Sequence, residues 1–373
     1  MEQHRARHLI PPSQRLPLEV QFLVLDEVPK VSQTWVIMRD SLRSCALTCQ
    51  AWLPRAHRHL YHTVYLDAPW QTPLLARTLT EFPITGPLIK HLHVPCFSYI
   101  VVNGHPERLP GRGYVPLAAN AVSKLTSLRS VAFRVPTNDY APPFFFPLVQ
   151  SFSVLGDLES LSFHNAMFPS TVIRNLLSSF PAIRSIAIDK CQWYGAGQPA
   201  PDANAYPDRY RDLRDLRIRT AITVGPYLDI FAEAVKLTSV LLWRHKLGSH
   251  DSYEGLRRYT QLKVLDLGTC NWNIAWMMET LSNVRSHKMR RLSLTLRSHE
   301  TSLETVIRHW SESGLDDVLS AAPFLGLEQF DLILYCSGFS HDAARVEIVR
   351  TLPQCHARGI LRLDIKPYKS AEK

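Results

Sequence analysis

Cysteine and histidine side chains gather near the N-terminus, where Cys45 and Cys49 are followed by His57, His59 and His62. Thiolates and imidazoles are the usual ligands of zinc, so this segment could bind that metal. No second close pair of cysteines completes a set of four ligands, and two cysteines four residues apart share one face of a helix. Cysteine is among the most buried residue types. We therefore expect both thiols to be core residues and predict no metal site.

Three acid–base side chains, His164, Asp189 and Asp266, follow or interrupt apolar segments of the chain. Catalysis by such groups needs hydrogen-bonding distances between them, which spacing in the sequence does not show. The sequence has no GxxxxGK(S/T), GxGxxG, HExxH or GxSxG motif for phosphate, metal or serine chemistry. We interpret these side chains as part of a solvated face, and predict no catalytic residue, no cofactor and no enzyme activity.

The composition of the 373 residues is typical of a globular protein, with 46% hydrophobic and 20% charged residues. The seven scattered cysteines do not indicate a disulfide framework, so we expect a reducing compartment, the cytoplasm or the nucleus. The N-terminus lacks the apolar core of a secretory signal, and the sequence has no apolar run long enough to span a membrane. The net charge of +9 permits association with nucleic acid, which we rank below protein binding.

A hexad with apolar residues at its first, fourth and sixth positions recurs along most of the chain, which is the strand signature of leucine-rich repeats. Its ten copies start at Ile89, Leu128, Leu158, Ile183, Leu213, Leu237, Leu262, Met289, Leu327 and Ile360. Each such unit can bury its apolar face only against its neighbours. We therefore predict an α/β fold, a leucine-rich-repeat-like solenoid with one parallel curved sheet.

The intervals between hexads predict both helices and loops. Apolar residues at helical spacing predict helices at Thr171–Ser179, Tyr227–Val235 and Ser302–Leu319, the last with a break near Gly314. Glycine and proline predict exposed loops at Cys191–Arg211 and, by a similar pattern, at Cys96–Gly113.

Five side chains flank the strand anchors, namely Arg134, Arg217, Arg219, Trp243 and Lys366. Alternation along a strand turns them away from the apolar core and toward the concave surface. Arginine and tryptophan are over-represented among the residues that dominate binding at protein interfaces. We interpret Arg134, Arg217, Arg219 and Trp243 as candidate substrate-binding residues, for an acidic or phosphorylated protein segment.

A different pattern occupies residues 16–66. Leu16-Pro17-Leu18-Glu19-Val20 opens an apolar run that continues through Leu25, and Pro17 suits the first turn of a helix. A second run, from Leu42 through Cys45, Ala46 and Cys49 to Trp52, predicts an amphipathic helix. We expect a small all-helical module here.

This module resembles the F-box, in particular the version found in large families of mushroom-type (basidiomycete) fungi. The resemblance covers about 50 residues and rests on Leu16-Pro17-x-Glu19-Val20, on Leu42 to Trp52, and on the continuation Leu53–Tyr61. Lys30–Asp40 makes the connection between the helices longer than is usual in that family. The resemblance implies a role in the helical core or in adaptor contact for Leu16, Pro17, Val20, Leu25, Leu42, Cys49 and Trp52.

By the same resemblance the chain would be the substrate-recognition subunit of an SCF-type cullin-RING ubiquitin ligase. Its F-box would dock onto a Skp-family adaptor, and through it onto a cullin, while the repeats would bind a protein substrate. The predicted parts are a flexible N-terminus (1–15), the F-box-like helical module (16–66), the solenoid (67–368) and a tail (369–373). One alternative is a repeat scaffold outside any ligase, in which the module only caps the solenoid.

Overall fold

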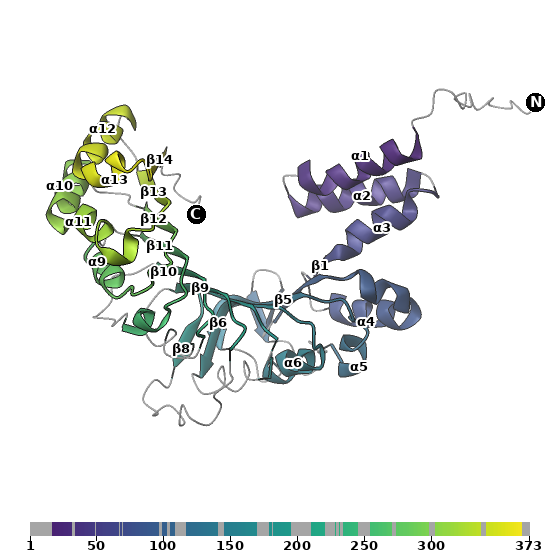
Figure 1. The fold of residues 1–373 in the computed structure, drawn as a ribbon. Coiled ribbons are helices and arrows are strands. Elements are labelled where there is room, and N and C mark those ends of the chain that lie inside the picture. Colours follow the sequence, from purple (N-terminus) through teal and green to yellow (C-terminus); the bar gives the residue numbers. More distant parts are fainter. Residues whose placement is uncertain are drawn as a thin grey trace, which may run out of the picture.

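The computed structural model describes residues 17–31, 34–48, 50–66, 68, 70–96, 99–102, 105–108, 117–140, 145–169, 179–180, 182–194, 210–220, 228, 231, 234–244, 254–270, 274–297, 303–336 and 341–367. These residues form an arc, with a helical module at the N-terminal end and a curved sheet along its inner side (Figure 1). Within this part of the chain, no helix combines the length and the apolar character that crossing a membrane requires.

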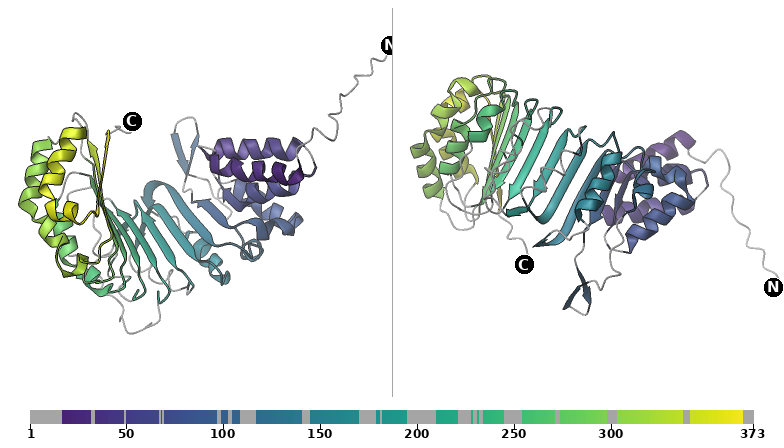
Figure 2. Two further views of the ribbon diagram at one scale, coloured as in Figure 1. Left: turned by 45° about the horizontal axis from the view of Figure 1, so that its top comes forward. Right: turned by 90° about the horizontal axis from the view of Figure 1, so that it is seen from below.

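One 12-stranded sheet, in which every pairing is parallel, forms the body of the protein. Eleven of its strands form one path that follows chain order, and each inner strand of the path pairs with the strand on either side (Figure 2). They are β1 (Thr63–Tyr65), β2 (His91–Pro95), β5 (Ser130–Tyr140), β6 (Ser160–Pro169), β7 (Ser185–Asp189), β9 (Asp215–Thr220), β10 (Ser239–Arg244), β11 (Val264–Cys270), β12 (Arg291–Arg297), β13 (Gln329–Cys336) and β14 (Leu361–Pro367), with β8 (Gln192–Tyr194) paired to β6 alone. The predicted parallel, curved solenoid is confirmed.

The register confirms the first nine hexads. Leu265, the fourth residue of its hexad, pairs with Val240 on one side and Leu292 on the other, and all three are buried. The same fourth position stays aligned from Leu92 in β2 to Phe330 in β13. Each strand thus contributes its apolar residues to one continuous core layer.

The predicted start of the tenth hexad was wrong by two residues. Leu361 pairs with Phe330 and Leu363 pairs with Leu332, so the hexad begins at Arg358 and not at Ile360. The Arg358 guanidinium takes the place of an apolar anchor, because it donates hydrogen bonds to backbone carbonyl oxygens, among them those of Leu319 (2.9 Å) and Phe324 (3.0 Å). A search for apolar residues alone therefore chose the wrong starting residue.

Helices and short 3₁₀ turns lie on the convex side of the sheet (Figure 2). They are α4 (Gln71–Glu81), η2 (Pro83–Leu88), α5 (Ala119–Val122), α6 (Phe145–Ser151), η3 (Phe152–Val154), η5 (Glu254–Arg258), α9 (Ile274–Ser282), α10 (Leu303–Ser313), α11 (Leu315–Leu319), η6 (Ala322–Phe324), α12 (His341–Thr351) and α13 (Pro353–Ala357). The predicted break near Gly314 is confirmed: this glycine separates α10 from α11 and has φ of +68°, a conformation that favours glycine.

The other predictions for the intervals between hexads were either wrong or fall mostly outside the described residues. Most of the predicted helices Thr171–Ser179 and Tyr227–Val235 lies outside the described residues. The predicted loop Cys96–Gly113 contains an antiparallel hairpin of β3 (Tyr99–Val102) and β4 (His105–Arg108), and the predicted loop after Cys191 begins with β8. Both loop predictions were therefore wrong for these residues, because backbone pairing with a neighbouring strand does not require an apolar pattern.

The N-terminal module consists of α1 (Leu18–Val31), α2 (Trp35–Thr48) and α3 (Leu53–His62). Its own small core includes the fully buried Leu25, Leu42 and Ala56, which lie apart from the continuous core of the solenoid. Helix α3 runs directly into β1, which lies within the range 16–66 and pairs with β2. Tyr61 and Val64 pack against the solenoid core, so the module is joined to the array without an intervening linker.

Candidate functional site

The structure places the predicted substrate-binding residues on the face of the sheet opposite the core. Arg134, Arg217 and Arg219 are exposed, and Trp243 is half-buried, each next to a buried neighbour in its strand. Arg217, Arg219 and Trp243 lie on the adjacent strands β9 and β10. Arg134 lies on β5 and is separated from them by β6 and β7, so it does not belong to the same local site.

Cations and aromatic rings alternate along this concave face over the C-terminal half of the sheet. The Cζ atom of Arg219 lies 5.9 Å from the centroid of the Trp243 ring, and that of Arg297 lies 4.7 Å from both Trp243 and Tyr335. The Nζ atom of Lys366 lies 5.8 Å from the Tyr335 ring. These separations are those of cation–π contacts. We call Arg219, Trp243, Arg297, Tyr335 and Lys366 the cation–aromatic ladder.

A glycine makes the ladder possible. Trp243 on β10 and Gly268 on β11 are paired in the sheet, and a β-carbon at position 268 would overlap the indole ring. The indole therefore lies across β11 and reaches Arg297, which belongs to β12. Without a side chain at position 268, a contact between residues two strands apart becomes possible.

The Arg297 guanidinium has no acidic partner within the described part of the chain. It makes no ion pair or hydrogen bond there, and its Nε atom is buried. Other cations of this face are paired: Arg291 Nε lies 2.9 Å from Asp331 Oδ2, and Lys366 Nζ lies 2.7 Å from Asp364 Oδ2. Two aromatic rings thus hold Arg297 in place while its charge is not neutralised by a neighbouring carboxylate.

Of the three acid–base residues named from the sequence, His164 and Asp189 contact each other, and Asp266 lies apart from them. His164 Nδ1 lies 3.4 Å from Asp189 Oδ2 across β6 and β7, and this hydrogen bond lowers the pKa of Asp189. Asp266 lies on β11, three strands beyond β7, where burial raises its pKa. Burial also raises the pKa of the Cys191 and Cys355 thiols to about 12, so neither is poised as a nucleophile.

In the N-terminal module, the seven residues implied by the F-box resemblance have different environments. Leu25 and Leu42 are fully buried, whereas Val20 is 39% exposed and Pro17 is exposed. The half-buried Trp52 donates a hydrogen bond from Nε1 to Gln21 Oε1 (2.7 Å). Leu16 and Cys49 lie outside the described residues.

Much of the apolar surface of α1 and α2 faces outward. On α1 the exposed fractions include 63% for Leu23 and 51% for Val24, with further exposed apolar side chains at Leu18, Val20 and Val31. On α2 they are Val36, Ile37 and Leu47. Large apolar side chains exposed in this number on a small module indicate a candidate interaction surface. We call these eight residues the apolar surface of the module.

An ion cluster ties α1 to α3. The Asp26 carboxylate accepts hydrogen bonds from Arg55 through two nitrogens and lies 2.7 Å from His59 Nε2. The Arg55 hydrogen bond, followed by that of His59, holds the pKa of Asp26 well below its usual range. The Arg55 guanidinium also lies 5.4 Å from the Phe22 ring. These contacts fix the orientation of α1 relative to the rest of the module.

The histidines of the suspected zinc segment have other partners. His59 contacts Asp26, while the ring centroids of His62 and His91 are 5.1 Å apart and that of His57 is 5.9 Å from Tyr61. Cys45 is half-buried, and Cys49 lies outside the described residues. In the part of the chain that the structure describes, no three cysteine, histidine or acidic side chains gather closely enough to hold a metal ion.

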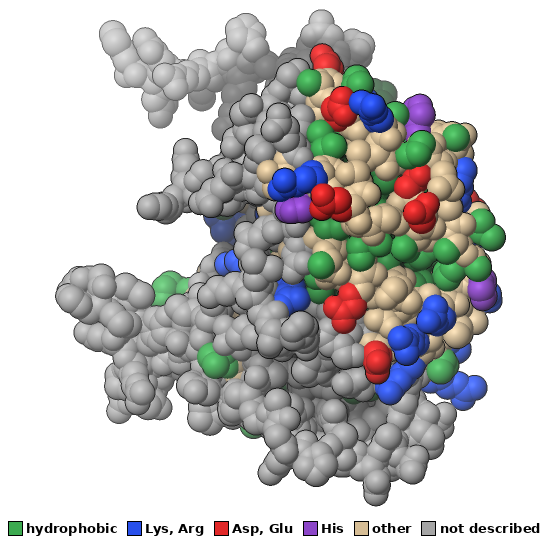
Figure 3. Space-filling model, turned by 90° about the vertical axis from the view of Figure 1, so that its left-hand side faces the viewer, with side chains coloured by type: hydrophobic (Ala, Val, Ile, Leu, Met, Phe, Trp, Pro, Cys, Tyr) green, Lys and Arg blue, Asp and Glu red, His purple; other side chains and the backbone are tan. Residues whose placement is uncertain are grey.

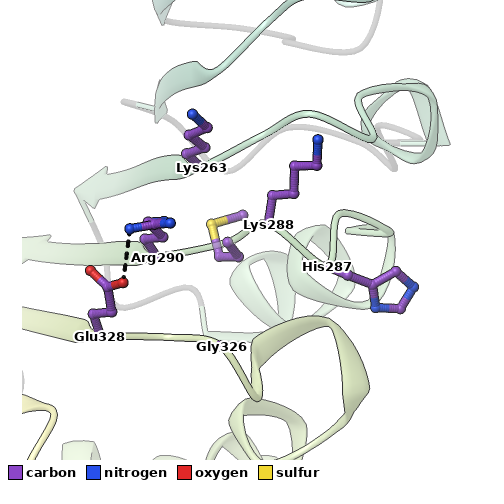
Figure 4. A pocket seen from close by; sticks show the side chains of 7 residues that line it. Lys263, His287, Lys288, Arg290, Gly326 and Glu328 are labelled. Atoms are coloured by element: carbon purple, nitrogen blue, oxygen red, sulfur yellow. Dashed lines mark hydrogen bonds and ion pairs between the residues drawn. The ribbon is translucent and has the colours of Figure 1, made fainter.

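A pocket of about 480 Å³ lies at the start of β11–β13 and is lined mainly by basic side chains (Figure 4). Arg290 Nη1 is bound to Glu328 (3.1 Å) and Lys288 Nζ to Gln261 (2.6 Å), and the His287 ring points away from them. On the side of the molecule that carries the C-terminal helices, acidic and basic side chains are interspersed with hydrophobic ones (Figure 3). Because Arg290 and Lys288 already have partners within the chain, we take the ladder, and not this pocket, as the candidate binding site.

Arg297 and Tyr335 were missed in the sequence. Both lie two residues beyond the side chains that directly flank a hexad, on the same face of their strands. Extending the alternation by one further step would have identified them. Lys366 occupies the same register as Tyr335 and was named only because the tenth hexad had been placed two residues too late. Their convergence on one another could not have been found in this way, since it depends on the register between β12 and β13.

Comparisons with known proteins add little. No protein-family model matches the sequence, and no curated protein matches it. Among solved structures, the chain is similar to an internalin from Listeria monocytogenes, with 14% sequence identity and a TM-score of 0.34, over 85% of this chain and 70% of that one. The description of the solenoid therefore rests on the strand pairing and the core of the chain itself.

Proposed function

We propose that the chain is a non-enzymatic substrate adaptor of an SCF-type cullin-RING ubiquitin ligase. Its N-terminal module docks onto a Skp-family adaptor, and the concave face of the solenoid binds a protein substrate. The apolar surface of the module carries this proposal. A module with its own buried Leu25 and Leu42 has no need of Leu23 and Val24 in its core, and their exposure fits a partner that covers them.

The arrangement of the two surfaces suits a bridge. The apolar surface belongs to α1 and α2 at one end of the arc, and the ladder belongs to β9–β14 toward the other end (Figure 1). Two proteins could therefore bind at once without competing for the same residues. In this proposal the chemistry of ubiquitin transfer belongs to other subunits, and the chain supplies position only.

The test is adaptor binding by the full chain. Changing Leu23 and Val24 together to aspartate places charge on the apolar surface and leaves the buried Leu25 intact. We expect adaptor affinity to fall at least about tenfold, because a small interface concentrates its energy in a few desolvated side chains. Val346, 66% exposed on α12, is the matched control: Val346→Asp should bind like wild type. Absence of adaptor binding by wild type would refute the ligase assignment.

A second candidate is a repeat scaffold in which the module is only a cap. The direct passage from α3 into β1, with Tyr61 packed on the solenoid core, favours it, because an end cap must cover the first strand of the array. Deleting residues 1–62 separates the two functions. If the module is only a cap, the deletion should destabilise the solenoid, and the intact chain should not bind the adaptor. If the module belongs to a ligase, the intact chain should bind the adaptor and the shortened chain should not.

A further inference from the structure

We infer that the cation–aromatic ladder binds an extended acidic segment of a protein partner through carboxylate groups. This inference deepens the proposed function and rests on it in one respect, that the concave face is the side that holds the substrate. It names the residues that make the contact and the chemistry that they recognise. Arg297 is its centre, with Arg219 beside it on the same face.

The Arg297 guanidinium is held in position by the protein itself. Trp243 and Tyr335 each lie 4.7 Å from its Cζ atom, which restricts the side chain to a narrow range of orientations. Its Nε atom is buried, and within the described residues no carboxylate neutralises it. A guanidinium held in advance loses little conformational freedom when a carboxylate accepts two of its hydrogen bonds. The site is therefore organised before an anion arrives.

Further exposed cations lie at the β9 end of the ladder. Arg217 and Arg219 are exposed on β9 and make no direct ion pair with a described residue, although Asp266 and Asp189, respectively, lie near enough to interact with their charges. Each arginine points toward the same concave space as Arg297, by the alternation of its strand. By contrast, Lys366 is paired with Asp364 at the opposite end. The attraction for an anion is thus centred on β9–β12.

The length of the ladder suits an extended peptide. The ladder crosses β9 to β14, five steps between neighbouring strands, which corresponds to about 24 Å at the usual spacing of strands in a sheet. An extended peptide covers this distance with roughly seven residues. A short linear segment of a partner is therefore long enough to run along the whole ladder from Arg219 to Lys366.

Nucleic acid suits this face less well than an acidic peptide. The rings of Trp243 and Tyr335 already contact cations, and Trp243 also lies against Gly268, so the ring surface left for stacked bases is reduced. Carboxylates at Asp266, Asp331 and Asp364 lie on the same face. They would repel a chain with one phosphate at every nucleotide, whereas a peptide can place its acidic residues at selected positions.

Fluorescence anisotropy of the full chain tests the inference. The probe is a labelled peptide of about ten residues that alternates glutamate and serine, long enough to span the ladder. We expect wild type to bind it and Arg297→Gln to bind it at least about tenfold more weakly. Gly268→Ala, which displaces Trp243 without changing any charge, should also weaken binding. The matched control Arg345→Gln removes an exposed arginine from α12, away from the concave face, and should change affinity less than about twofold.

Four results would overturn the inference. They are equal binding of the corresponding glutamine–serine peptide, equal weakening by Arg345→Gln, tighter binding of an oligothymidylate of similar length, and no binding of the acidic peptide at low salt. Arg219→Gln, at an exposed position, keeps the test decisive if Arg297→Gln fails to fold. Adaptor affinity is measured on the same proteins. If wild type binds the acidic peptide but not the adaptor, the ligase proposal alone is refuted. If wild type binds the adaptor but not the acidic peptide, the ladder inference alone is refuted.

Discussion

The indole of Trp243 occupies the space above Gly268 on the neighbouring strand, where any other residue would place its β-carbon. This relationship decides the geometry of the concave face. It directs the tryptophan across β11 to Arg297, so that a residue of β10 contacts a residue of β12. Aromatic and cationic side chains that alternation alone would leave on separate strands thereby form one connected surface.

Gly268→Ala should therefore disturb the ladder. The added methyl group overlaps the indole, and either the indole or the strand must move, at a cost of about 1–3 kcal/mol in the free energy of unfolding. Chemical denaturation measures the cost, and near-ultraviolet circular dichroism reports on the tryptophan environment. Gly156→Ala is the control, because a β-carbon there meets no atom within 4 Å. Equal effects of both substitutions would contradict the packing of Trp243 on Gly268.

Leu265→Ala should destabilise the solenoid by about 2–5 kcal/mol, since Leu265 is fully buried between Val240 and Leu292 and its loss leaves a cavity. The midpoint of urea unfolding checks this. Substitution of the exposed Leu325, 67% exposed, by alanine serves as the control and should change stability by less than about 0.5 kcal/mol. An unchanged midpoint for Leu265→Ala would show that the core layer is misassigned.

Arg358→Ala should cost about 1–3 kcal/mol, because the lost guanidinium leaves partly buried carbonyl groups near η6 without their donor. Arg358→Lys should recover only part of the loss, since one ammonium group cannot reach carbonyls that the two terminal nitrogens of arginine serve. Thermal unfolding of the two variants tests this. A lysine variant as stable as wild type would show that charge alone matters at this position.

The Asp26 cluster predicts a dependence of module stability on acid. The folded-state pKa of Asp26 lies below its unfolded value, mainly because of the Arg55 hydrogen bond. Its contribution is therefore present above about pH 4, the ordinary range of an aspartate, and is lost as the pH falls through the folded-state pKa. Asp26→Asn should destabilise the module at pH 7, and the difference from wild type should shrink on acidification.

Hydrogen exchange of α1 and α3 across this pH range measures the effect. Asp157→Asn removes the same charge from a side chain that is 71% exposed on the solenoid, and should leave the exchange of both helices unchanged. A difference between wild type and Asp26→Asn that stays constant from neutral to strongly acidic pH would show that the carboxylate charge is not what joins α1 to α3.

The sequence by itself determined the solenoid. A strand that buries one face must place apolar residues at alternate positions, so the anchors around Leu92, Leu265 and Phe330 could be read directly and in the correct register. The same alternation assigned Arg219 and Trp243 to the opposite face. It failed at Arg358, because there hydrogen bonds to carbonyl oxygens replace an apolar contact.

Only the tertiary structure decided which side chains of the concave face meet. The intervals between strands differ in length, so sequence separation does not indicate that Trp243 reaches Arg297 or that Asp26 binds Arg55. Such contacts depend on strand register, on helix orientation and on the missing side chain at Gly268. An apolar pattern specifies the side that a residue faces, whereas polar partners are selected by distance and direction, which exist only once the chain has folded.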